Sequence, residues 1–299
     1  NNLFTLCHLI YTDTFYMKRK WIRWVSWILL TPIILFVILM VLLYVPPVQN
    51  LLRREVTAYA SKATGMQIQV ERIDLRFPLN LLVRGVEVIQ QPDTLLSLES
   101  LNVRVQAWPL IKGKVEVDEV TLSRVAVNSA DLMEGMKIKG VLGRFFLQSH
   151  GVDLSNELAV INQVELSDTH VQLLMNDTTT TPKDTTASAP INWKVALHQL
   201  KLKNVSFSMQ LPADSMRMAA HIGEAAIDDA QADLKNQYYD LKKFLLSGTS
   251  ASYDTGTAQP AEGFDASHIA VRDIRIALDS LLYKGRDMNA VIREFTMNE

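Results

Sequence analysis

The sequence predicts a mainly β protein, with a transmembrane helix near its N-terminus and a short amphipathic helix before a long antiparallel sheet. Three observations support this fold class. Residues 25–45 are almost wholly apolar, residues 46–65 carry apolar side chains at helical spacing, and from residue 66 apolar side chains recur mainly at every second position. No later stretch alternates long helices with strands, which argues against a βαβ architecture.

Composition and charge exclude several classes of protein. Of the 299 residues, 48% are apolar and 21% are charged, which is close to the globular average and excludes wholesale disorder. The net charge is −2, and four of the basic side chains lie close together near the start, so the remaining chain is mildly acidic and poorly suited to nucleic acid. The one cysteine, Cys7, provides neither a disulfide framework nor a cysteine-based metal site.

The first residues contain a second candidate start. Met17 is followed at once by the basic run Lys18, Arg19 and Lys20. We therefore expect residues 1–16 to be a non-native upstream extension and residues 17–24 to be a basic segment that stays in the cytoplasm.

Residues 25–45 are long enough to span a membrane. As a helix they would rise about 31 Å, against roughly 30 Å for the hydrocarbon core. A cleaved signal peptide would have a shorter apolar region of about 7–15 residues and a small-x-small cleavage site, whereas Pro46 and Pro47 follow here. The sequence therefore predicts an uncleaved anchor, and the positive-inside rule places everything after Val45 across the membrane.

The helix predicted over residues 46–65 is amphipathic and ends at Gly65. Its apolar residues are Val48, Leu51, Leu52, Val56, Tyr59, Ala60 and Ala63. Two placements are open: the helix packs as a lid on the first strands, or it lies on the membrane surface.

Residues 66–175 and 191–299 predict short strands that share a repeated pattern. In four copies the apolar parity switches at one polar residue, and these residues are Arg124, Asp168, Asn204 and Asp273. One face can stay apolar only if the strand has a bulge or tight bend there. The Thr-rich stretch 176–190 between the two regions has almost nothing to bury, so it predicts an exposed loop that the fold can spare.

A parity switch at Asn204 would gather apolar side chains from two strands on one face. Nine residues are expected to share it: Val164, Leu166, Val171, Leu173, Leu200, Leu202, Val205, Phe207 and Met209. Alternation alone leaves two structures open, a closed sandwich core and an open curved sheet whose apolar face binds acyl chains, because both require one dry face.

The sequence offers no sign of catalysis. The six histidines are scattered singly, and no two of them have the spacing typical of a metal site. The nucleophile-elbow, phosphate-loop and dinucleotide-binding motifs are all missing. Asp228 and Asp229 are adjacent carboxylates, and a polar run around them favours a solvated edge. We therefore expect no enzyme activity and no cofactor or metal.

The order of these elements resembles a known family. An anchor is followed by a helix ending at Thr64-Gly65, and then by four strand segments over residues 68–73, 82–88, 98–108 and 110–122. This order is similar to the start of the TamB branch of the AsmA-like proteins, closely over about residues 17–130 and less closely through 299. The family's usual proline after Leu122 is absent, with Arg124 and Val125 in its place.

The resemblance implies a curved antiparallel sheet that forms an elongated apolar groove. It implies a single-pass protein of the Gram-negative inner membrane, with a cytoplasmic N-terminus and its bulk in the periplasm. The implied role is in outer-membrane biogenesis, as a conduit that carries phospholipid acyl chains between the membranes. The alternative is a translocation and assembly module scaffold that helps to insert outer-membrane β-barrel proteins.

The resemblance also implies a partner of the Omp85 type in the outer membrane. The family meets that partner through a C-terminal part that this sequence lacks, so we expect the natural chain to continue beyond Glu299. No catalytic residue is carried over, because the family has none.

Overall fold

A computed structural model describes the chain from residue 46 to residue 298, apart from short gaps. The gaps are residues 77–78, 91–92, 107, 110–115, 130–134, 154–156, 176–191 and 257–264. The predicted extension 1–16, basic segment 17–24 and anchor 25–45 lie outside the described residues. No helix within the described part is long and apolar enough to cross a membrane.

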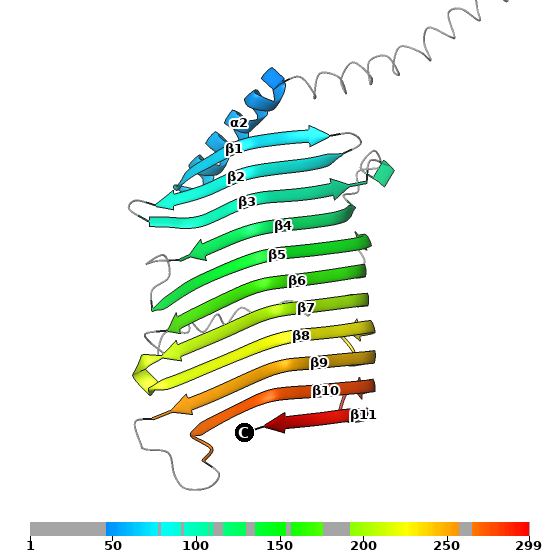
Figure 1. Cartoon of the computed structure of the whole chain (residues 1–299). Helices are drawn as coiled ribbons and strands as arrows, with labels where there is room; N and C mark the ends of the chain where they lie inside the picture. The colour runs from blue at the N-terminus through cyan, green and yellow to red at the C-terminus, as the bar shows by residue number, and fades with distance from the viewer. Residues whose placement is uncertain are drawn as a thin grey trace, which may run out of the picture. The chain divides into compact units, whose positions relative to one another are not determined.

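The chain divides into two compact units, Asn1–Leu51 and Leu52–Glu299. The second unit is an open, curved, eleven-stranded sheet whose strands lie side by side in chain order (Figure 1). This confirms the predicted mainly β class. The elements are α2 (Pro46–Thr64), β1 (Gln67–Arg76), β2 (Asn80–Gln90), β3 (Asp93–Val105), β4 (Val117–Asn128), β5 (Met136–Asp153), β6 (Leu158–Met175), β7 (Lys194–Leu211), the 3₁₀ turn η1 (Pro212–Asp214), β8 (Met216–Asp233), β9 (Tyr238–Thr255), β10 (His268–Lys284) and β11 (Asp287–Asn298).

The prediction of a fully antiparallel sheet is wrong at one pair. β6 and β7 run parallel, with Leu158 opposite Lys194 and Leu174 opposite Gln210, while every other neighbouring pair is antiparallel. Parallel neighbours need a crossover connection, because the chain must return to the end where the first strand began. The connection from Met175 to Lys194 must therefore be long enough for such a return. That the Thr-rich stretch 176–190 can be spared stays a prediction.

The four predicted parity switches are confirmed as sharp bends. Arg124, Asp168, Asn204 and Asp273 all have left-handed backbone conformations, with φ between 47° and 53°. The strand register places Asp168 directly beside Asn204. Gly143, Gly223 and Gly248 continue the column on the strands between the other bends, with a register shift beside Asp273. We call the whole column the bend seam, and it consists of Gly85, Glu99, Arg124, Gly143, Asp168, Asn204, Gly223, Gly248 and Asp273.

Residue types along the bend seam follow from crowding between neighbouring backbones. A Cβ added at Gly143 would lie 2.7 Å from the Cβ of Asp168, and one added at Gly223 would lie 2.8 Å from the carbonyl oxygen of Gly248. Where a side chain does fit, it bonds across the strands, since Asn204 Nδ2 donates to Asp168 Oδ1 at 2.8 Å. Asn and Asp tolerate the left-handed conformation better than most residues.

The core of this fold is shallow. Only a few apolar side chains are buried, among them Ile73, Leu95 and Leu98, and none of the large side chains in the described part is completely enclosed. The sheet has no second sheet packed on it within the described residues. A closed sandwich core, one of the two structures left open by the alternation, is therefore not what these residues form.

Candidate functional site

The nine predicted face residues lie on β6 and β7 and mostly meet in direct pairs. Because these two strands are parallel and in register, eight of the nine are cross-strand partners, and Val205 lies opposite Thr169. The pairs are Val164 with Leu200, Leu166 with Leu202, Val171 with Phe207 and Leu173 with Met209. Directly opposed apolar side chains on one face pack against each other.

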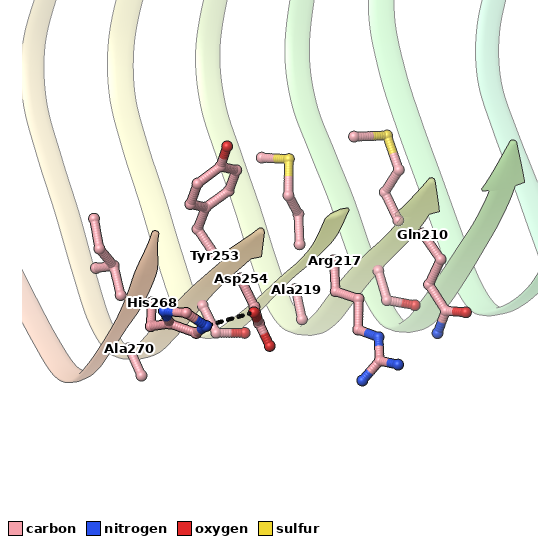
Figure 2. Close-up of a pocket in the computed structure, with 12 residues that line it drawn as sticks. Gln210, Arg217, Ala219, Tyr253, Asp254, His268 and Ala270 are labelled. Carbon is pink, nitrogen blue, oxygen red and sulfur yellow. Dashed lines mark ion pairs between the residues drawn. The ribbon is translucent and has the colours of Figure 1, made fainter. Parts of the chain in front are cut away.

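The rows that start at these pairs continue across the neighbouring strands. The row of Met209 continues through Met218, Tyr253 and Ile269 on β8, β9 and β10. Figure 2 shows Tyr253 on the side toward which the strands curve. We call this side the inner face. Residues two apart on a strand share a face, so Val205 and Phe207 lie on it with Met209.

Beyond the bend seam, Leu200 and Leu202 begin two further apolar rows. The row of Leu200 contains Ile227, Phe244 and Leu278, and the row of Leu202 contains Ala225, Leu246 and Ile276. The left-handed residue Asn204 interrupts the pleat between Leu202 and Val205, as the parity argument requires. That these rows continue the inner face stays a prediction, together with the role of all nine residues in binding lipid.

The inner face is accessible. Phe207 keeps 40% of its surface exposed although it lies in the middle of the sheet, and Met218 on the next strand is exposed to a similar degree. At the last strand, Phe295 lies opposite Ile276 and is 56% exposed. An apolar surface that stays uncovered over several strands is typical of a binding surface.

The opposite side of the same strands, which we call the outer face, carries polar side chains around Gln210 and Asp254, although Val141 in the row of Ser206 is 53% exposed. Figure 2 shows Gln210, Arg217, Asp254 and His268 pointing away from Tyr253. They line a hollow of about 410 Å³ together with Ala219 and Ala270. The row of Met209, Met218, Tyr253 and Ile269 also contributes to its lining. The charged side chains of Arg217 and Asp254 therefore lie on the outer face, on the other side of the sheet from Tyr253.

Sequence reasoning missed the polar pairs of the outer face. His268 lies between two carboxylates, with Nδ1 2.9 Å from Asp265 Oδ2 and Nε2 3.4 Å from Asp254 Oδ1. Ser206 Oγ lies 3.0 Å from His221 Nδ1. Asp265 lies only three residues before His268, but Asp254 and His221 lie on the strands next to those of their partners, so only the register could have revealed these contacts.

These outer-face pairs do not assemble into a recognisable catalytic or metal centre. A hydroxyl activated by histidine needs a third group that orients the imidazole, and no carboxylate forms an ion pair with His221 in the described part. Nor do the described residues include a group of three potential metal ligands. The other histidines in the described part also bond polar neighbours, as His198 does with Asp229 at 2.9 Å.

The two edges of the sheet differ. At the first edge, the side chain of Arg53 in α2 donates to the carbonyl oxygens of Val70 and Glu71 in β1, so the helix is bonded to the backbone of the edge strand. At the other edge, every residue of β11 is exposed. Exposed strand edges can pair with an added strand.

Comparisons with known proteins leave the family open. No protein-family model matches the chain, and no curated protein matches it either.

Proposed function

We propose that the chain is a membrane-anchored, lipid-conducting β-groove protein of the TamB branch. It would lie in the periplasm, anchored in the inner membrane of a Gram-negative cell, and carry phospholipid acyl chains toward the outer membrane. The observation that supports this most is the uncovered inner face of a single curved sheet, with apolar rows that cross several strands.

The dimensions and chemistry of the inner face suit an acyl chain. Eleven strands at about 4.8 Å spacing extend for about 48 Å, roughly three times the half-thickness of a bilayer core. An acyl chain needs continuous apolar contact and no hydrogen-bond partner. The inner rows supply such contact, while side chains such as Arg217 and Asp254 lie on the outer face.

A charge on the inner face tests this proposal. A charge in hydrocarbon costs several kcal/mol, so Phe207→Asp should displace lipid while the already exposed site lets the variant fold. Ser208→Asp, on the outer face of the same strand, is the matched control and should keep its lipid. The measurements are thermal melting and mass spectrometry of phospholipids that co-purify with the full chain.

Each outcome for the pair of variants has a distinct meaning. Near-normal melting with lipid lost only in Phe207→Asp supports the conduit. Collapse of melting in Phe207→Asp alone would mean that the face is covered in the native protein. Normal melting with lipid retained in both variants would contradict a lipid path at this position.

A second candidate function is the assembly scaffold, and the exposed edge at β11 favours it. A client strand that pairs with this edge would contact Val291 or Ile292, not Phe207. Photo-crosslinkers at these positions separate the two functions, because a scaffold yields protein adducts at β11 and a conduit yields lipid adducts at Phe207. In either function, contact with an Omp85-type partner is part of the proposal.

A further inference from the structure

The helix α2 contacts the sheet with its polar side. Arg53, Thr57 and Ser61 follow at four-residue spacing, so they share one side of the helix, and all three are partly buried. Arg53 Nη1 donates to the carbonyl oxygens of Val70 and Glu71 at 3.4 and 3.0 Å, and Ser61 Oγ accepts from the backbone N–H of Ile68 at 3.1 Å. Through these bonds the helix runs beside the free edge of β1 (Figure 1).

The apolar side of the same helix is not covered by any of the described residues of the second unit. Val56 is 45% exposed, Tyr59 is 77% exposed, and Ala63 is exposed as well. The three residues follow at spacings of three and four, so they form one stripe. Most helices in proteins are stabilised by burying such a stripe. The lid placement would require it to pack on the first strands, and it does not.

The sequence around the stripe indicates what covers it. The helix begins at Pro46, directly after the apolar segment 25–45, so Val56 follows the end of that segment by only eleven residues. The exposed cation of Lys62 lies beside the stripe, whereas Arg54 lies on the opposite side of the helix. Tyrosine and lysine beside an apolar stripe are typical of helices that lie in the interface of a bilayer.

We propose that α2 lies on the bilayer surface, with Val56, Tyr59 and Ala63 among the acyl chains and the Arg53 side bound to β1. The helix thereby holds the first strand of the sheet at the membrane. This inference rests on the anchor that is part of the proposed function, but it does not depend on lipid binding to the inner face.

The test is depth measurement by spin labelling. The full chain, with Cys7→Ser as background, is reconstituted in vesicles of phosphatidylcholine and phosphatidylglycerol, and a nitroxide is attached at Tyr59→Cys. The matched control is Ala58→Cys, an exposed position next to it that lies off the stripe. Collision with oxygen, which concentrates in the bilayer, is compared with collision with a water-soluble nickel chelate. Circular dichroism of both variants verifies the fold.

The proposal predicts that the label at position 59 is more accessible to oxygen and the label at position 58 to nickel. Nickel accessibility at both positions would place the stripe in water and overturn it. A label at 59 shielded from both reagents would mean that protein covers the stripe, and oxygen accessibility at both would mean that the helix is immersed. Loss of the chain from the vesicles on carbonate washing would refute the anchor and this inference together. A failure to find lipid bound at Phe207 would contradict the proposed function but would leave this inference about α2 intact.

Discussion

The inner and outer faces of β7 are made from alternate residues of one strand, yet they have opposite chemistry. Val205, Phe207 and Met209 lie on the inner face, and Ser206, Ser208 and Gln210 lie between them. In an ordinary pleat this separation would persist only if the apolar residues kept one parity. Here the parity changes at Asn204, and the bend seam changes it in the neighbouring strands at the same place. The contrast between the faces therefore depends on backbone conformation as much as on residue type.

The largest effect is expected from removing the crossover between β6 and β7. If residues 176–191 are replaced by a two-residue turn, the four residues that remain between Met175 and Lys194 reach about 14 Å at most. Because β6 has 18 residues, this turn leaves the start of β7 out of reach of its partner. We expect loss of the cooperative melting transition.

The control for this deletion is a Gly/Ser segment of the native length, which should melt within a few degrees of the native protein. A deletion variant that melts normally would show that β6 and β7 are not parallel.

The second largest loss of stability is expected from adding a side chain at Gly143 in the bend seam. Its Cβ would lie 2.7 Å from Asp168 Cβ and 3.0 Å from the Asp168 carbonyl oxygen, so Gly143→Val should destabilise the fold by about 3 kcal/mol. Gly140→Ala in the same strand is the control, because its nearest contact is 3.4 Å and its cost should stay within about 1 kcal/mol. Denaturant unfolding measures both, and equal stabilities would contradict the crowding at the seam.

Asn204 tests the seam through conformation and hydrogen bonding. Asn204→Val loses the bond to Asp168 and forces a branched residue into the left-handed region, for an expected cost of about 2 kcal/mol. Asn204→Gly loses the bond but relieves the conformational strain, so its cost should be about 1 kcal/mol or less. The free energy of unfolding should therefore be lowest for the valine variant, higher for the glycine variant and highest for the native protein. A valine variant as stable as the glycine variant would mean that no left-handed bend exists there.

The smallest effect is expected at the turn between β8 and β9, away from the bend seam. The backbone N–H of Asn236 donates to the Asp233 carboxylate at 3.0 Å, and this bond and one from the Asn236 side chain hold the pKa of Asp233 below its ordinary 3.8. A lowered carboxyl pKa stabilises the fold above the unfolded pKa, and the stabilisation is lost as pH falls through the folded pKa.

Asp233→Ala should therefore melt slightly below the native protein at neutral pH, and the difference should shrink as the pH falls below the ordinary pKa of 3.8 and through the lower folded pKa. A difference that is unchanged over this pH range would exclude the carboxylate as its cause.

The repeated strand pattern allowed much of the fold to be predicted. Parity switches at Arg124, Asp168, Asn204 and Asp273 are visible because polar residues interrupt an apolar alternation, and all four bends are present. Gly143 and Gly223 were not recognised as members of the same column. A glycine has no side chain whose parity can be followed, and only the register shows what it faces.

The parallel pair could not be predicted for a related reason. Alternating apolar residues require one dry face, and they do so equally in parallel and antiparallel strands. The direction of β7 relative to β6 depends on which end of β6 the chain reaches before Lys194. The residue pattern of the Thr-rich stretch does not indicate which end that is. Likewise, Ser206 and His221 are unremarkable apart, and their contact exists only because β7 and β8 pair.

The most direct test of the central claim, that the inner face carries lipid, is photo-crosslinking in native membranes. A benzophenone amino acid replaces either Phe207 on the inner face or Ser208 on the outer face of β7, in the full chain. The account predicts phospholipid adducts at position 207 and few or none at position 208. Equal adducts at the two positions, or adducts only at position 208, would contradict it.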